Sequence, residues 1–156
     1  MTLTIEPLSR CAQCIATLAE WHDREWRHLN VPEYDLSARI RDYELALQDE
    51  TLPQMFVALL DATVVGSVRI IHNNMDNHPQ WFPWLASLYV YPPYRQRGIA
   101  TQLIARVIEE TPRLGYCQLY LLTEDQQSMY QRLGWRIVCE EEYNGQIVSI
   151  MHRALN

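Results

Sequence analysis

The chain of 156 residues contains no lysine, so all 13 of its basic side chains are arginines. This absence excludes enzymes that hold a substrate or cofactor through a lysine imine, and nucleotide sites built on a Walker-type lysine. Because 19 acidic residues outnumber the arginines, the formal net charge is −6. A protein that binds nucleic acid needs a basic face, so this balance argues against a nucleic-acid partner.

Long apolar runs and densely spaced cysteines are also missing. No apolar run approaches the ~18 residues that a membrane span requires. The first ten residues, MTLTIEPLSR, lack the charged start and apolar core of a secretory signal. Four cysteines in 156 residues are too few for a disulfide-stapled scaffold. We therefore expect no membrane partner and a cytoplasmic location.

The composition is that of one folded domain. Hydrophobic residues make up 48% of the chain and charged residues 21%, proportions typical of soluble globular proteins. No repeat, low-complexity tract or linker divides the chain, and its length is that of one ordinary domain. We therefore expect a single domain over residues 1–156.

The spacing of apolar residues predicts a mixture of strands and helices. Ser9 is the expected cap of the first helix. Strands are predicted at 3–8, 55–60, 64–72, 84–91, 118–122, 135–140 and 147–153, and helices at 10–27, 35–49, 98–110 and 125–133. One strand–helix–strand crossover combined with hairpins indicates a mixed sheet covered by helices, an α/β fold of the α+β type.

The stretch from Leu88 to Thr101, LYVYPPYRQRGIAT, carries the clearest chemical signal. An apolar strand stops at two prolines, and a short loop then leads through Gly98 into a helix. The first turn of a helix has unpaired N–H groups and the positive end of the helix dipole, which together attract anions. Arg95 and Arg97 add positive charge, and Gly98 lets the backbone approach a ligand closely. The stretch suits a pyrophosphate; the alternative is a plain turn with two solvated arginines.

The pattern V-x-P-x-x-R-x-x-G-I-A in this stretch resembles the acetyl-CoA signature of the GNAT superfamily of N-acetyltransferases. The resemblance implies the GNAT fold, a mixed sheet of six to seven strands with splayed central strands and about four flanking helices. It implies acetyl-CoA as co-substrate. It places the pantetheine arm against Leu88, Tyr89 and Val90. It places the pyrophosphate on the loop formed by Arg95, Gln96, Arg97, Gly98, Ile99, Ala100 and Thr101.

A second stretch, from Asp125 to Trp135, looks like a later motif of the same family, a short helix that ends in Y-x-x-x-G-[FYW]. Gly134 fits the end of a helix that turns sharply into a strand. Tyr130 matches the family's tyrosine that protonates the departing thiolate, a general acid. The alternative is that Tyr130 is a core aromatic residue whose hydroxyl is paired.

The resemblance implies an N-acetyltransferase in which the primary amine of a small molecule or peptide attacks the thioester directly. One alternative is a non-catalytic module that binds acyl-CoA. A remote alternative is a thiol redox protein, because Cys11 and Cys14 form a C-x-x-C motif at a helix start. Both cysteines share an apolar stripe with Ile15 and Leu18, which favours a place in the core. No ordered cysteine and histidine spacing predicts a metal site.

The general base is the weak point of the resemblance. Many members carry a glutamate on the central strands, where this chain has none, and Thr123 replaces an asparagine that contacts the cofactor. Candidates for the base are Glu124, Asp76, His72 and His78; a relay of water molecules is the alternative.

The resemblance places the acceptor pocket between residues 26–34 and 74–84. These segments offer an aromatic wall from Trp26, Tyr34, Trp81, Phe82 and Trp84. Acidic residues at or beside them, Glu25, Glu33, Asp35 and Asp76, favour a cationic amine. Ordinary packing and solvated acids are the alternative. A homodimer through the closing strands is common in the family and is a further expectation.

Overall fold

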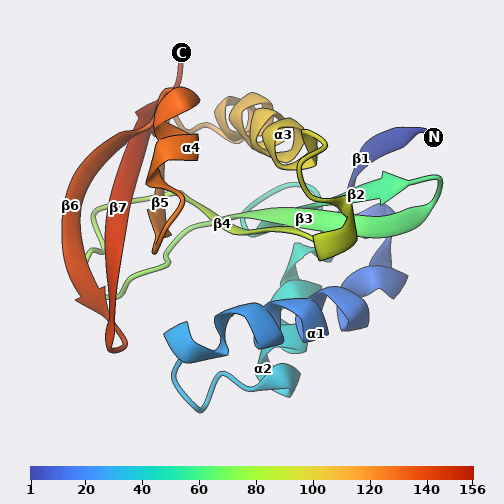
Figure 1. The fold of residues 1–156 in the computed structure, drawn as a ribbon, viewed down its shortest axis with the longest axis horizontal. Coiled ribbons are helices and arrows are strands. Elements are labelled where there is room, and N and C mark those ends of the chain that lie inside the picture. Colours follow the sequence, from blue (N-terminus) through green and yellow to red (C-terminus); the bar gives the residue numbers. More distant parts are fainter.

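The computed structural model describes all 156 residues as one seven-stranded sheet with helices on both faces (Figure 1). The strand order is β1-β2-β3-β4-β5-β7-β6. The strands are β1 (Leu3–Pro7), β2 (Gln54–Leu60), β3 (Thr63–Ile71), β4 (Trp84–Val90), β5 (Gln118–Thr123), β6 (Arg136–Tyr143) and β7 (Gln146–Ala154). The helices are α1 (Ile15–Trp26), α2 (Leu36–Glu44), α3 (Ile99–Arg113) and α4 (Gln127–Arg132). The predicted mixed sheet and its four helices are confirmed.

The centre of the sheet separates between β4 and β5. All other neighbouring strands are antiparallel, and α3 provides the one parallel crossover. β4 and β5 share a single register pair, Trp84 with Tyr120. Figure 1 shows the two strands running apart from there. This confirms the predicted splay, which leaves backbone groups without strand partners at the middle of the sheet.

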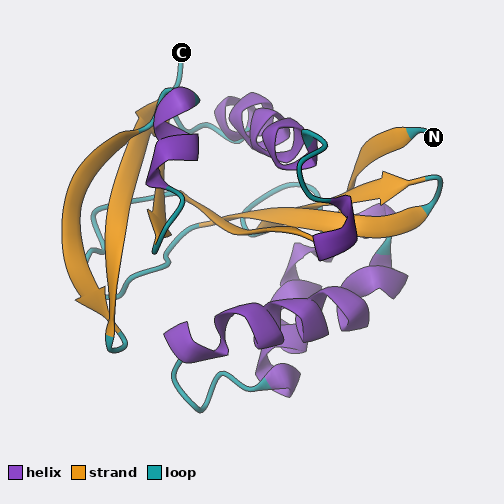
Figure 2. Ribbon diagram, viewed as in Figure 1, coloured by secondary structure: helices purple, strands orange, loops and turns teal.

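Two apolar cores lie on opposite faces of the sheet. The stripe of α3, which includes Ile99, Leu103 and Val107, packs into the larger core on one face. The stripe of α1 joins Tyr43 of α2 and residues of β2 in the second core. Figure 2 shows the resulting arrangement, with α3 on one side of the strands and α1 and α2 on the other. No helix combines the length and apolar composition that a bilayer crossing requires.

The first helix begins five residues later than predicted, at Ile15. Two short 3-10 turns precede it, because Cys11 adopts a backbone conformation (φ −137°, ψ 38°) that interrupts the helix. Ser9 caps no helix; its hydroxyl donates to Asp49 Oδ1 at 2.8 Å. Cys11 and Cys14 are both buried, and burial raises the pKa of each thiol. The two cysteines are core residues, which speaks against redox chemistry.

The second helix is shorter than predicted. The Asp35 carboxylate accepts a hydrogen bond from the Ala38 N–H at 2.9 Å, so this residue caps α2. α2 ends at Glu44 and continues only as a 3-10 turn over Leu45–Leu47.

A glycine positions the end of α4 as predicted. Gly134 has a positive φ of 94°. The Trp135 N–H donates to the Tyr130 carbonyl at 3.1 Å, and the Gly134 N–H donates to the Gln131 carbonyl at 3.1 Å. These two bonds form a Schellman motif, which turns the chain directly from α4 into β6. The turn fixes Tyr130 beside the opening between β4 and β5.

Candidate active site

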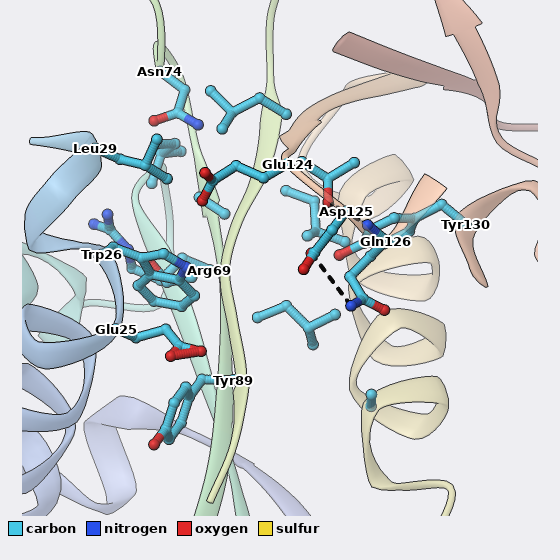
Figure 3. Close-up of a pocket in the computed structure, with 18 of the residues that line it drawn as sticks. Glu25, Trp26, Leu29, Arg69, Asn74, Tyr89, Glu124, Asp125, Gln126 and Tyr130 are labelled. Carbon is cyan, nitrogen blue, oxygen red and sulfur yellow. Dashed lines mark hydrogen bonds between the residues drawn. The ribbon is translucent and has the colours of Figure 1, made fainter. Parts of the chain in front are cut away.

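An open cavity of about 1330 Å³ lies where β4 and β5 separate. The start of α3, the loop after β5, the α1–α2 connection and the β6–β7 turn all contribute to its wall. Figure 3 shows Glu25, Trp26 and Tyr89 on one side of this cavity and Tyr130 on the other. The cavity therefore connects the start of α3, at Gly98, with side chains from the N-terminal and C-terminal parts of the chain.

The entry to α3 has the geometry of an anion site. Gly98 has a φ of 79°, and a Cβ built on it meets no atom within 4 Å. The N–H groups of Ile99, Ala100 and Thr101 open the helix and have no carbonyl one turn earlier to bond with. Nine of the ten residues predicted for the cofactor line the cavity: Leu88, Tyr89, Val90, Arg95, Gln96, Gly98, Ile99, Ala100 and Thr101.

Arg95 ties this loop to the strand before it. Its Nε donates to the Val90 carbonyl at 2.7 Å, and its guanidinium lies 5.5 Å from the centre of the Tyr89 ring. The Oε1 atom of Glu25 on α1 lies 3.9 Å from Arg95 Nη2. The arginine therefore presents positive charge at the cavity while it holds the end of β4.

Arg97 is the exception among the predicted cofactor residues. It does not line the main cavity but a separate one of about 170 Å³, which Leu3, Leu60 and Gln102 also border. Its guanidinium stacks over Tyr94 at 5.4 Å. Arg97 therefore lies outside the wall that Arg95 and Gln96 line.

Tyr130 lines the cavity although only 6% of it is exposed. Its ring packs edge-on against Trp135, with the ring centres 5.8 Å apart. No protein group hydrogen-bonds its hydroxyl, and the hydroxyl oxygen keeps some accessible surface. Burial raises the pKa of Tyr130, so the phenol is protonated at neutral pH. The paired-hydroxyl alternative is not what the structure shows.

Two of the four candidate bases lie at the cavity and two do not. Glu124 and Asp76 line it. Glu124 reaches toward Leu29 in Figure 3, and its Oε1 is 2.7 Å from Nε2 of His28. His72 instead stacks on Phe82, with ring centres 4.7 Å apart. His78 is bound to Glu141 at 2.7 Å and also lies outside the cavity.

The predicted aromatic and acidic wall is only partly present. Trp26, Tyr34, Glu25 and Asp76 line the cavity as expected. The other predicted members, Trp81, Phe82, Trp84, Glu33 and Asp35, do not.

The three aromatic residues are engaged elsewhere because the segment before β4 folds back on the sheet, whereas Asp35 caps α2. Trp84 is fully buried, and its indole N–H donates to the Trp81 carbonyl at 2.6 Å. Trp81 stacks on Tyr120 at 5.4 Å. Their side chains therefore pack against β5 and leave the acceptor side of the cavity to other elements.

Several cavity residues were missed by the sequence reasoning. Asp42, Arg69 and Ser87 come from α2, β3 and β4, far apart in sequence. Asn144, in the β6–β7 turn, donates through Nδ2 to the Leu29 carbonyl at 2.7 Å and so closes one end of the wall. The only local signal was Arg69 itself, a charged residue inside an otherwise apolar strand.

Three features of the cavity fit coenzyme A. The space beside Gly98 is empty where a side chain would stand, and the first N–H groups of α3 have no backbone partner. The divergence of β4 and β5 leaves strand backbone groups free for an extended arm. No cluster of three or more histidine, cysteine or acidic side chains is arranged to hold a metal ion.

Known proteins resemble this chain in sequence. Aminoglycoside N(6')-acetyltransferase type 1 of Salmonella enteritidis is 35% identical over 101 residues, which cover 60% of this chain and 68% of that protein. The protein of the same name from Salmonella typhimurium is 36% identical over 94 residues, which cover 55% of this chain and 63% of that one.

Solved structures share the fold. The yncA protein of Salmonella typhimurium, solved with its cofactor acetyl-CoA, superposes with a TM-score of 0.77 at 17% identity and covers 100% of this chain and 95% of that one. Aminoglycoside 6'-acetyltransferase type Ii superposes with a TM-score of 0.71 at 19% identity, over 99% of this chain and 97% of that one.

The family model described as the acetyltransferase (GNAT) family matches residues 15–135. This range includes the Arg95–Thr101 loop and the α4 motif that contains Tyr130. Enzymes of this family use acetyl-CoA as co-substrate. The match covers most of the chain and agrees with the fold, and it favours an acyltransferase over the redox and non-catalytic alternatives. The chain therefore belongs to the acetyltransferase (GNAT) family and is an acyltransferase.

Proposed function

We propose that this enzyme transfers the acetyl group of acetyl-CoA to a primary amine on a cationic small molecule by direct attack. The observation that carries the proposal is the single cavity that connects the α3 anion site to an acid-lined wall. When bound, acetyl-CoA supplies the activated acetyl group as a thioester. The loop from Arg95 to Thr101 would hold its pyrophosphate, and the backbone of Leu88, Tyr89 and Val90 would hold the pantetheine arm.

Tyr130 is the proposed proton donor to the departing sulfur. Its hydroxyl is free of protein partners and protonated, so it is available to donate. Burial disfavours a thiolate as well as a phenolate, and the hydrogen bond from Tyr130 would stabilise the negative charge on the sulfur as it develops. The assignment of Tyr130 as acid is supported by this geometry and by the motif.

Glu124 is the proposed carboxylate for the incoming ammonium. It follows directly on β5, lines the cavity and is paired only with His28. An alkyl ammonium with a pKa of ~10 must lose a proton before its nitrogen can attack. Glu124 can accept that proton directly or through water, and His28, which is half exposed, connects it to solvent.

The charge of the wall supports a substrate with more than one positive group. Glu25, Asp42, Asp76, Glu124 and Glu142 all line the cavity. The two Salmonella relatives are named for aminoglycosides, which fits an acid-lined wall. We therefore propose an aminoglycoside or another polyamine as the acceptor, in preference to a peptide N-terminus.

The location and assembly of the enzyme remain proposals. Its four cysteines are unpaired, which suits a reducing compartment such as the cytoplasm. Ile137 of β6 and Ile147 of β7 are exposed apolar residues on the closing strands, which supports a homodimer through that pair. Size-exclusion chromatography with light scattering tests the dimer.

Thermal unfolding with acetyl-CoA, free coenzyme A and ATP tests the cofactor site first. Ligand at 100 times its dissociation constant stabilises a protein by ~2.7 kcal/mol, which corresponds to a rise of several degrees in Tm. We expect both CoA species to raise Tm and ATP to have no effect. No shift at millimolar concentration would overturn the assignment of the Arg95–Thr101 loop.

Thiol release with a panel of acceptors tests the substrate class. The panel contains an aminoglycoside, a linear polyamine, a monoamine and a peptide with a free N-terminus. We expect turnover to be fastest with the first two, because they carry several ammonium groups. Turnover confined to the peptide would contradict the proposal, although the acetyl-CoA site would stand.

A further inference from the structure

Ser87 has an unusual backbone conformation at the point where β4 enters the cavity. Its φ is +54°, in the left-handed region that non-glycine residues seldom adopt. The register between β3 and β4 shifts there, from Ser67 opposite Tyr89 to Arg69 opposite Ala86. This bulge lies directly before Leu88, Tyr89 and Val90, so its shape decides where that part of the strand points.

Two side chains of β3 hold the bulge. Arg69 donates through Nε to Ser87 Oγ at 3.0 Å, and Ser67 donates through Oγ to the Ser87 carbonyl at 3.1 Å. Both residues are buried, Ser67 completely and Arg69 to all but 7%. A non-glycine residue in a left-handed conformation is strained and persists only where its surroundings determine it. Here those surroundings are the two hydrogen bonds.

A chain of buried hydrogen bonds leads to the Ser67 hydroxyl from α2. Arg39 Nη1 donates to the Tyr43 hydroxyl at 3.1 Å, and that hydroxyl lies 2.6 Å from His22 Nδ1. His22 Nε2 lies 2.8 Å from Ser67 Oγ. Because Ser67 already donates to Ser87, it accepts from His22. Every donor in this chain therefore points toward the bulge.

The far end of Arg69 reaches the acceptor wall. Its Nη1 donates to Asp42 Oδ2 at 3.0 Å, and the same oxygen accepts from the Tyr34 hydroxyl at 2.6 Å. Asp42 lines the cavity with its side chain 34% exposed. The guanidinium stacks on the Tyr43 ring at 4.7 Å, which fixes its plane. One side chain therefore contacts both Ser87 of the cofactor strand and a carboxylate of the acceptor wall.

We infer that Arg69 is a positioning residue for acetyl transfer: it holds the Ser87 bulge in the shape that binds acetyl-CoA and orients Asp42 toward a cationic acceptor. The first half concerns the free enzyme and acetyl-CoA alone. The second half rests on the proposed function, since it assumes a cationic amine. β3 also packs closely against β4 just beyond the bulge: a Cβ at Gly66 would stand 2.7 Å from the Tyr89 carbonyl oxygen, so this part of the strand has little room to shift.

The test compares Arg69→Gln with two double variants, Arg69→Gln/Ser87→Gly and Arg69→Gln/Ser87→Ala. Calorimetric titration gives the Kd of acetyl-CoA for each folded protein. We expect Arg69→Gln to raise this Kd about tenfold, because the bulge relaxes when its support is lost. Glycine at 87 adopts a positive φ without strain and should return the Kd to within about threefold of the parent value. Alanine should not.

This pattern separates positioning from general stability. Loss of the Arg69 packing should lower Tm in all three variants, and the relief of strain by glycine at position 87 should return only part of that loss. Equal Kd values for the glycine and alanine variants, or an unchanged Kd in Arg69→Gln, would overturn the inference. If Arg69→Gln does not fold, Ser67→Ala with the same two replacements at 87 makes the same comparison, because it removes the other bond to the bulge.

Steady-state kinetics with the best amine of the panel test the second half, the orientation of Asp42 toward the acceptor. Asp42→Asn should raise the KM for the amine and leave the Kd of acetyl-CoA unchanged, whereas Arg69→Gln should change both. An unchanged amine KM in both variants would overturn this half. If no amine is turned over by the parent enzyme, the proposed acceptor fails, and the acetyl-CoA titrations still decide the role of Arg69.

Discussion

The cofactor side and the acceptor side of the cavity are built in different ways. On the cofactor side, the lining residues come mostly from one stretch, Leu88 to Thr101, and the first N–H groups of α3 are free of backbone partners. On the acceptor side, single side chains arrive from α1, α2, β3, the loop after β5 and the β6–β7 turn. A local motif suffices for the first side, whereas the second depends on the whole fold.

The difference teaches where changes in substrate can arise. A helix start offers its backbone N–H groups to an anion largely independently of the side chains. The proposed contacts of the acceptor depend instead on charges such as those of Glu124 and Asp42, which single substitutions can alter. Four substitutions test this comparison, from the largest expected effect to the smallest.

Gly98→Val should abolish measurable acetyl-CoA binding at millimolar concentration. The added side chain would stand in the open space at the start of α3 and would strain a residue with φ 79°. Gly115→Val is the matched control: its φ is 96°, its Cβ would also meet nothing within 4 Å, and it does not line the cavity. Calorimetry and Tm should show similar destabilisation in both variants and loss of binding only in the first.

Tyr130→Phe should lower kcat about 100-fold, because general acid catalysis contributes typically 10²–10⁴-fold. The Kd of acetyl-CoA should stay within a factor of about two, since the hydroxyl makes no contact that holds the fold. Steady-state thiol release measures the first quantity and titration the second. A kcat equal to that of the parent enzyme would remove Tyr130 as the acid.

Glu124→Gln should lower kcat/KM for the amine at least tenfold, because a hydrogen bond to a charged group contributes about 1.5–3 kcal/mol. The Kd of acetyl-CoA should not change. Glu33→Gln is the control, since Glu33 was expected on the same wall and does not line the cavity. Equal losses in the two variants would mean that net charge, and not the position of Glu124, governs the amine.

His22 allows a comparison that leaves both ligands out. Burial, with Arg69 and Arg39 nearby, lowers the pKa of His22 well below its ordinary value. In the unfolded chain the His22 imidazole takes up a proton with a pKa of about 6.5, whereas in the folded protein it stays neutral. Its contribution to the free energy of unfolding is therefore fully present above that pH and declines as the pH falls below it.

His22→Gln keeps a donor for Ser67 and removes the titration. Urea unfolding of both proteins at several pH values between 5 and 7.5 measures the effect. We expect the free energy of unfolding to fall less steeply with decreasing pH in the variant. The difference between the two curves isolates His22 from the other acids and histidines. Parallel curves would show that His22 is not held neutral in the folded state.

Much of the fold could be predicted from the sequence because its signals are local. The alternating strands, the stripe of α3 and Gly134 at the end of α4 each depend on neighbours within a few residues, and each was confirmed. The first helix was predicted to begin at a cap on Ser9. That prediction was wrong because the Ser9 hydroxyl bonds instead to Asp49, 40 residues away.

The candidate site divides in the same way. The cofactor loop is contiguous, so nine of its ten predicted residues line the cavity, while Arg97 faces elsewhere because the loop turns between Arg95 and Gly98. Trp81 and Trp84 are absent from the wall because Trp81 stacks on Tyr120 and Trp84 packs against the same ring at a tilt, which buries their aromatic surface. No residue pattern near Trp81 in the sequence predicts that Tyr120 is its packing partner.

The sequence by itself determined the order of the elements, the entry to α3 through Gly98 and the place of Tyr130 near the end of α4. These depend on hydrogen bonds and apolar spacing within a few residues of the chain. Only the tertiary structure decided that Arg69 joins Ser87 to Asp42, that Glu124 meets His28, and which acids face the cavity. Such contacts join residues 18 to 96 positions apart, so no pattern of neighbouring residues along the chain can predict them.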